Sequence, residues 1–256
     1  MSRPPWRTAL SLFTAIPVGG DAQLRKEDAA RAVRWLPAVG LLLGGIGSCV
    51  LLGAGGASES RRLLGAALAV AAIALLTGGL HLDGLADTAD GLGSRRPAAE
   101  ALDIMRRSDI GPMGVAALVL VLLVQVTALA AIPRPPQAAA ALVLAEVTGR
   151  VSVVIATGSP AARPGGFGAL VAGGTSTRQR AATVALLGCA VGLGGLAAGG
   201  AALAERGLAA TIAGLLAGWF VLATAQRRLG GTTGDVFGAI VSLSATAVLV
   251  TAALVS

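Results

Sequence analysis

Charged and aromatic residues are scarce in this sequence. Of its 256 residues only 13% are Asp, Glu, Lys or Arg and 3% are aromatic, with no tyrosine and a single histidine. Soluble domains carry about 25% charged residues, so a scarcity of this degree excludes an ordinary soluble domain. The few aromatic rings also provide no platform on which bases could stack, so we expect no nucleic-acid partner despite a formal net charge of +7.

Cysteine is nearly absent as well. The two cysteines, Cys49 and Cys189, lie far apart in the sequence, and each is inside an apolar stretch. This pattern favours neither a disulfide framework nor a cysteine metal site. We interpret both as small packing residues.

Hydrophobic residues are abundant, at 55% of the chain, and the mean hydropathy is +0.79. About 20 apolar residues cross the hydrocarbon core of a bilayer as a helix. We therefore predict an all-α fold: a polytopic integral membrane helical bundle of about seven transmembrane helices, forming one domain over residues 1–256 in a lipid bilayer. The predicted spans are 36–54, 63–80, 114–132, 138–157, 181–204, 207–225 and 236–255.

Small residues recur along these spans at the GxxxG spacing, which lets helix backbones approach closely. The spacing predicts a compact bundle, although a chain rich in glycine and alanine also produces such pairs by chance. The pairs are Gly40/Gly44, Gly188/Gly192, Gly195/Gly199 and Gly214/Gly218.

Residues 1–35 precede the first span and join a short apolar stretch to a charged segment. Arg31 and Arg34 come just before the span, and Trp35 stands at its start. Basic residues and tryptophan are typical of the membrane–water boundary. We predict an N-terminal interfacial segment over 1–35.

The distribution of basic residues predicts the orientation of the spans. With seven spans and a cytoplasmic N-terminus, the inside loops hold fifteen Lys and Arg residues and the outside loops four, and Arg150 within a span completes the twenty. The positive-inside rule favours that orientation. We therefore expect a multi-pass protein of the cell inner membrane whose 81–113 loop is cytoplasmic.

That loop, 81–113, is the most charged in the chain, with five aspartates, one glutamate and four arginines. Asp83, Asp87 and Asp90 are spaced i, i+4, i+7, so a helix places them on one stripe within roughly 60°. Like charges so close favour a bound cation, and carboxylates suit Mg²⁺. The alternative is a solvated, acid-capped helix end. His81 is a candidate ligand or general base, but it points about 160° from Asp83 on the same helix.

The segments HLDGLADTADG (81–91) and ALDIMRRSDIGPMG (101–114) resemble those of the cobalamin 5′-phosphate synthases, also called adenosylcobinamide-GDP ribazoletransferases. ARPGGFG (162–168) and LGGTTGDVFGA (229–239) are similar to two further loops of that family. The family usually has Asp-Ser-Arg where this sequence has Arg107-Ser108-Asp109, so the two charges are exchanged about Ser108.

The resemblance implies a transferase of late cobalamin (vitamin B12) biosynthesis. Its substrates would be adenosylcobinamide-GDP and α-ribazole or α-ribazole 5′-phosphate, with GMP released and adenosylcobalamin or its 5′-phosphate formed. It implies catalytic and Mg²⁺-binding roles for Asp83, Asp87 and Asp90, with His81 as a further candidate base. The implied substrate-binding residues are Ser108, Arg163, Arg227, Arg228, Gly231, Thr233 and Asp235.

Three points stay open in the sequence. Asp235 is predicted to join Asp83, Asp87 and Asp90 in one site, since it and they lie at the cytoplasmic ends of predicted spans. The alternative is that Asp235 caps the last span. Glu146 and Arg150 are four apart within a span and are expected to pair or to face the site. The alternative functions are another metal-dependent phospho-alcohol transferase and an ion-coupled transporter, and a second copy of the chain is a candidate partner in a homo-oligomer.

Overall fold

The computed structural model describes residues 4–19, 24–56 and 58–256, and these fold into helices joined by short connections. The elements are α1 (Pro5–Phe13), α2 (Lys26–Val33), α3 (Leu36–Ala54), α4 (Glu59–Leu76), α5 (Leu80–Gly93), α6 (Ala98–Ile104), α7 (Pro112–Ala131), α8 (Pro135–Ala156), α9 (Gly166–Val171), α10 (Thr177–Gly199), α11 (Ala201–Leu229) and α12 (Gly234–Leu254).

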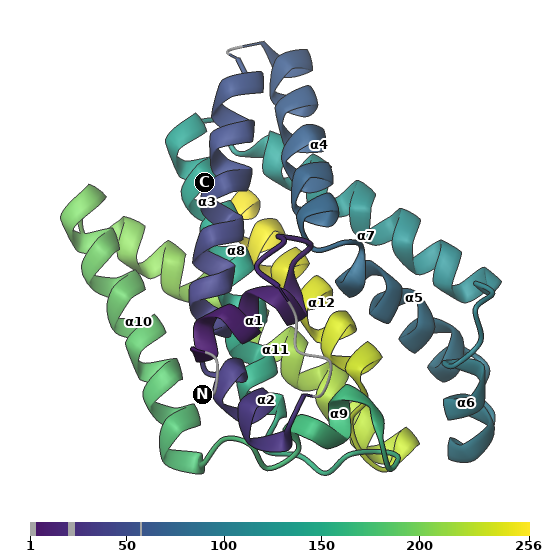
Figure 1. The fold of residues 1–256 in the computed structure, drawn as a ribbon. Coiled ribbons are helices and arrows are strands. Elements are labelled where there is room, and N and C mark those ends of the chain that lie inside the picture. Colours follow the sequence, from purple (N-terminus) through teal and green to yellow (C-terminus); the bar gives the residue numbers. More distant parts are fainter. Residues whose placement is uncertain (1–3, 20–23, 57) are drawn as a thin grey trace.

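The long helices form a bundle with α8 and α12 at its centre (Figure 1). Both central helices are largely buried, whereas Leu187 is the one buried residue among those described in α10. Figure 1 shows α10 on one side of the bundle and α5, α6 and α7 on the other. The all-α bundle predicted from the apolar runs is confirmed.

Six of the described helices are long and apolar enough to cross a membrane: α3, α7, α8, α10, α11 and α12. The pair α4 and α5 makes a seventh if it counts as one broken span, since the two helices meet at 89°. This agrees with the prediction of about seven. The stretch 138–157, which carries two charges, is one of the six as part of α8.

Several span boundaries differ from the predicted ones, and two of these differences arise at glycines with positive φ. The second span does not run to residue 80, because α4 ends at Leu76 and the chain turns at Gly78 and Gly79, both at positive φ (59° and 74°). Glycine adopts this backbone region without a steric penalty. The sixth span begins at Ala201 rather than 207, because Gly200 (φ 77°) breaks the chain between α10 and α11.

Three of the four GxxxG pairs lie at close helix contacts. A Cβ added at Gly40 would lie 2.6 Å from the carbonyl oxygen of Glu146, so α3 packs directly on α8. Gly214 and Gly218 of α11 approach α8 and α12 in the same way. The pair at 188 and 192 has nothing within 4 Å of either added Cβ, and the pair at 195 and 199 packs at the α10–α11 turn.

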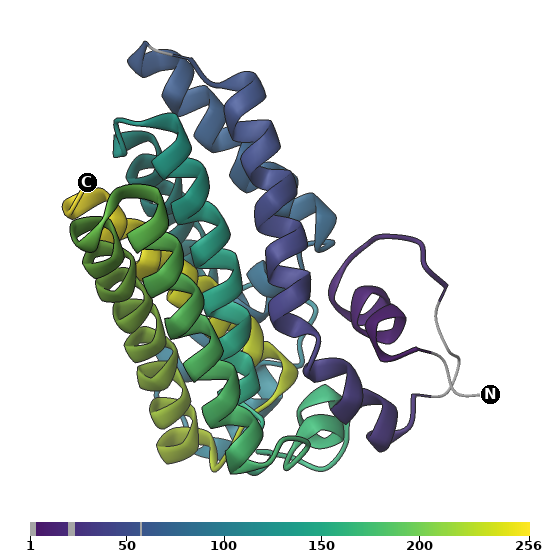
Figure 2. The same cartoon turned by 90° about the vertical axis from the view of Figure 1, so that its left-hand side faces the viewer.

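The N-terminal segment lies to one side of the bundle, beyond α3 (Figure 2). Its described part contains the short helices α1 and α2, and residues 1–3 and 20–23 of the predicted 1–35 segment lie outside the described residues. The backbone N–H of Ala15 donates to the carbonyl of Leu76 (2.7 Å). This bond holds the end of α1 against the α4–α5 turn.

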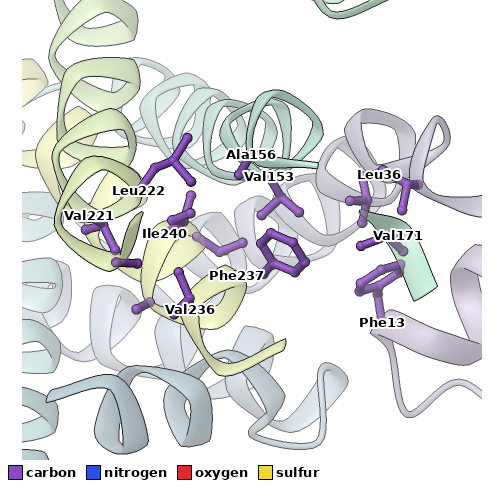
Figure 3. Close-up of a cluster of buried hydrophobic side chains, with 14 of the residues drawn as sticks. Phe13, Leu36, Val153, Ala156, Val171, Val221, Leu222, Val236, Phe237 and Ile240 are labelled. Atoms are coloured by element: carbon purple, nitrogen blue, oxygen red, sulfur yellow. The ribbon is translucent and has the colours of Figure 1, made fainter. Parts of the chain in front are cut away.

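A buried apolar cluster joins the N-terminal segment to the start of α12 (Figure 3). The ring of Phe167 packs edge-on against Phe13 (centroids 5.3 Å apart) and Phe237 (6.2 Å). Figure 3 shows Phe237 beside Val153 of α8. Rings in this arrangement contribute beyond their buried area. The cluster therefore fixes the α8–α9 connection and the first turn of α12 in one place.

The two charges within α8 pair with each other. Arg150 is 1% exposed, and its guanidinium donates to the carboxylate and to the carbonyl oxygen of Glu146. A lone charge at membrane depth costs at least about 2.5 kcal/mol on insertion scales. The pairing explains how both residues are accommodated in a central helix, as expected from their i, i+4 spacing.

Candidate functional site

The three aspartates predicted to share one helix face lie on α5. Asp83 is exposed and Asp87 and Asp90 are partly buried, while Gly84, Leu85, Ala86, Thr88 and Gly91 make up the buried face. The acidic stripe therefore borders the surface along which α5 packs on the bundle. Its position depends on how α5 is held.

Glycine-to-glycine contact brings α5 against α12. A Cβ added at Gly84 would lie 2.6 Å from the carbonyl oxygen of Asp235 and 3.1 Å from the Cα of Gly238. A Cβ added at Gly238 would lie 3.0 Å from the Cα of Gly84. No side chain separates the two backbones here, so the first turn of α12 lies directly beside the acids of α5.

The two glycine-containing loops that resemble the family pair with each other through their backbones. Ala162 donates its N–H to the carbonyl of Thr232 (2.9 Å), and Thr232 donates its N–H to the carbonyl of Pro160 (2.9 Å). Gly231 is buried against residues 160–162, where a Cβ would meet the Pro160 carbonyl oxygen at 2.5 Å. The loops at 160–168 and 229–235 therefore form one unit.

This unit orients Arg163 and Asp235 toward each other. The guanidinium of Arg163 lies 3.5 Å from the Asp235 carboxylate and also donates to the carbonyl of Leu102 in α6 (3.2 Å). Thr233 caps α12, because its hydroxyl accepts from the N–H of Val236 (3.2 Å) and donates to Asp235 (3.1 Å). The N-cap is thus Thr233 and not Asp235, whose carboxylate instead contacts Thr233 and Arg163.

The charges of both segments act on one another. The carboxylate of Asp87 interacts electrostatically with those of Asp83, Asp90 and Asp235 and with the guanidinium of Arg163. One arginine beside four carboxylates leaves an excess of negative charge, and partial burial strengthens the repulsion. A cation placed among them would be stabilised. The placement of Asp235 beside the α5 acids, expected from the sequence, is what the structure has.

Asp90 already has backbone partners. Its two carboxylate oxygens accept hydrogen bonds from the N–H groups of Gly111 (2.7 Å) and Gly114 (2.8 Å), at the first turn of α7. A Cβ at either glycine would collide with this carboxylate. An acid at a helix N-terminus satisfies N–H groups that have no partner within the helix. Asp90 therefore ties α7 to α5, a role that the sequence analysis missed although two glycines flank Pro112, a residue typical of a first helical turn.

The donor set fits a magnesium ion that is completed by substrate. Among the described residues no three His, Cys, Asp or Glu side chains are grouped so as to hold a metal by themselves. Mg²⁺ usually takes one or two protein carboxylates together with waters and phosphate oxygens. In the ranges described, Asp83 and Asp87 make no hydrogen bond or ion pair through their carboxylates, so these two are the residues best placed to hold it.

The remaining predicted residues are spread around this centre. The backbone of His81 packs on α12: its carbonyl accepts from Ser242 (3.3 Å), and a Cβ added at Gly238 would lie 3.1 Å from the same carbonyl oxygen. Ser108 is exposed between α6 and α7. Arg227 and Arg228 are exposed in the last turn of α11. The structure does not bring these four side chains into contact with the acids of α5.

Comparison of the sequence with those of known proteins identifies the family of this chain. The profile of cobalamin-5-phosphate synthase matches residues 5–253. The chain belongs to the cobalamin-5-phosphate synthase family. Relatives named adenosylcobinamide-GDP ribazoletransferase include those of Stutzerimonas stutzeri (41% identity, 98% of each chain), Frankia casuarinae (37%, 97% of this chain and 94% of the relative) and Bradyrhizobium diazoefficiens (38%, 96% and 92%). No solved structure matches this family member.

We predict that Gly84→Ala abolishes most of the transferase activity of this family member without unfolding it. The added methyl must push α12 away from α5, and a displacement of about 1 Å at a catalytic site can cost about 10²-fold in rate. Activity and thermal unfolding of the purified variant measure this. Gly45→Ala is the matched control, because nothing lies within 4 Å of its added Cβ. Equal activity of both variants would show that the α5–α12 contact does not set the site.

Proposed function

We propose that this protein transfers the phospho-corrinoid group of adenosylcobinamide-GDP to α-ribazole or α-ribazole 5′-phosphate. A ribose hydroxyl oxygen attacks the phosphorus attached to the corrinoid side chain. The new P–O bond forms as the bond to the bridging oxygen of the diphosphate breaks, GMP leaves, and the hydroxyl proton passes to a base. Family membership and the names of the relatives support this reaction.

The observation that carries the proposal is the meeting of Arg163 with the acids of α5 and α12. Phosphoryl transfer depends on positioning and on neutralising the charge of the phosphates. The Arg163 guanidinium provides paired donors for phosphate oxygens beside Asp235. Asp83 and Asp87 would hold Mg²⁺, which would supply positive charge to the diphosphate. Arg227 and Arg228, exposed at the same loop unit, are proposed to attract the guanosine phosphate end from further out.

The proton of the attacking hydroxyl needs an acceptor near the phosphorus. Asp87 lies among the other acids and is only partly exposed, so a carboxylate of α5 is better placed than His81, which the helical spacing turns about 160° from Asp83. A base must reach the hydroxyl directly or through one water. We therefore assign proton removal to an α5 aspartate. Asp90 is proposed to position α7 rather than to touch the substrate.

The proposal is tested by incubating purified protein with adenosylcobinamide-GDP, α-ribazole and Mg²⁺ and following GMP by chromatography. We expect GMP and the joined corrinoid product in equal amounts, and neither when α-ribazole or Mg²⁺ is omitted. GMP released without α-ribazole would indicate hydrolysis instead of transfer. No reaction by folded protein would contradict the proposal.

The Mg²⁺ concentration that each variant requires should distinguish the aspartates that bind the metal from the one that does not. We expect Asp83→Asn and Asp87→Asn to lower the rate at least about 10²-fold and to raise the Mg²⁺ concentration needed for half-maximal activity. Asp90→Asn should lower thermal stability by about 1–3 kcal/mol, because the amide cannot accept both N–H groups, while the Mg²⁺ requirement stays unchanged. A raised Mg²⁺ requirement in Asp90→Asn would return that residue to the metal site.

We also propose that the site faces the cytoplasm. The connections at this end of the bundle are those to which fifteen of the twenty basic residues were assigned. Reporter fusions after Ser94 and after Ser256 should give opposite locations, with the first cytoplasmic. The same location for both would mean that the number of crossings is even.

A further inference from the structure

A cleft opens beside the acids of α5, and neither Arg163 nor any residue of α12 lines it. Its volume is about 600 Å³, within the roughly 300–1,000 Å³ typical of small-molecule pockets. Three segments far apart in the sequence form its walls: the end of α1 with Leu12, Thr14 and Ala15, the α4–α5 turn, and the side of α7 at Leu118. Asp83 lies on its wall, so the cleft is continuous with the candidate site.

The cleft is built by two backbone features described above. The turn at Gly78 and Gly79 sends α5 away from α4 at 89° and leaves space in the angle between them. The hydrogen bond from Ala15 to Leu76 (2.7 Å) then brings the N-terminal segment over that angle. The added Cβ of Gly78 would lie 3.9 Å from the Cβ of Ala15, so this methyl group faces the turn.

The chemistry of the walls selects a neutral, apolar ligand with a hydroxyl group. Thr14 and Thr77 are buried, and their hydroxyls donate to the backbone carbonyls of Leu10 (2.6 Å) and Ile73 (3.0 Å) of their own segments. Asp83 is the charged residue of the lining, which holds no lysine, arginine or histidine. The lining therefore offers no cationic side chain to the oxygens of a diphosphate, whereas a hydroxyl can donate to the Asp83 carboxylate.

These properties distinguish between the two substrates of the proposed reaction. The donor carries two phosphates and a guanosine, and the cationic Arg163, which pairs with Asp235, does not line the cleft. The acceptor is a riboside of a flat, apolar benzimidazole. With its base between the apolar walls, its ribose would lie at Asp83, where the attacking hydroxyl is needed.

We propose that the cleft between α1, the α4–α5 turn and α7 binds the benzimidazole base of the ribazole and holds a ribose hydroxyl at Asp83. This inference rests on the proposed function, since that function supplies the identity of the ligand. It assigns the two substrates to different places beside α5: the acceptor in the cleft, and the donor diphosphate between the α5 acids and Arg163.

Filling the cleft tests the assignment. Ala15→Phe places a ring in it from an irregular segment, outside the acids and Arg163. We expect the KM for α-ribazole to rise at least tenfold, with kcat and the KM for adenosylcobinamide-GDP within twofold of wild type. The control is Val119→Phe, which places the same ring at an exposed position of α7 that lines a different hollow and should change neither KM.

A second variant keeps the test decisive if Ala15→Phe does not fold. Leu82→Ala removes an apolar contact from the cleft wall and should raise the KM for α-ribazole about threefold to tenfold with an unchanged donor KM. Benzimidazole alone should inhibit competitively against α-ribazole and not against the donor. If both variants keep the wild-type KM for α-ribazole, or if the donor KM rises instead, the assignment is wrong.

Direct binding separates this inference from the proposed function. In equilibrium dialysis of the detergent-solubilised full chain without donor, wild type should bind α-ribazole at least tenfold more tightly than Ala15→Phe. That result without GMP release would preserve the cleft and overturn the proposed function. GMP release together with equal binding of α-ribazole by both proteins would preserve the proposed function and overturn the assignment of the cleft. Loss of co-purifying phospholipid in Ala15→Phe with unchanged α-ribazole binding would identify a lipid site and overturn the assignment.

Discussion

The contact of Gly84 with the first turn of α12 is the constraint on which the site depends. Two helix backbones can approach this closely only where neither carries a side chain, and the residues flanking the contact are Asp83 on one helix and Asp235 on the other. Charges that repel one another are held together because apolar packing elsewhere offsets the repulsion. The buried cluster around Phe237, a residue of this same turn, provides that packing.

The acids of α5 divide into two kinds when their partners are considered. Asp90 uses both carboxylate oxygens on the first turn of α7, so it links two helices and fixes the far wall of the cleft. Asp83 and Asp87 have no such partners in the described chain and remain available to a cation or a substrate. The structure therefore suggests why three acids recur along one stripe although a magnesium ion requires only one or two.

Sequence patterns were sufficient for the features that depend on local order. Apolar length predicted the spans, and the i, i+4, i+7 spacing predicted that Asp83, Asp87 and Asp90 share a helix face. The 89° turn was missed because Gly78 and Gly79 continue an apolar run, and composition does not report backbone angles. The break at Gly200 was missed for the same reason, since the next charges come only at Glu205 and Arg206.

The capping of α7 by Asp90 and the cleft beside Asp83 depend on contacts between distant segments. Asp90 meets a glycine 21 residues away, and the cleft needs the end of α1 to reach the α4–α5 turn. The pattern of apolar and polar residues within one segment cannot predict a contact with a distant segment. His81 illustrates the reverse case: the helical angle already separated it from the acids, and the structure packs its backbone against α12.

A cryo-electron microscopy structure of the protein in lipid nanodiscs with adenosylcobinamide-GDP and Mg²⁺, but without acceptor, would test the central claim most directly. We predict the diphosphate between α5 and the 160–168 loop, with phosphate oxygens within about 4 Å of the Arg163 guanidinium and a metal ion joining them to Asp83 or Asp87. A diphosphate bound in the cleft of α1 and α7, or anywhere remote from Arg163, would contradict the account.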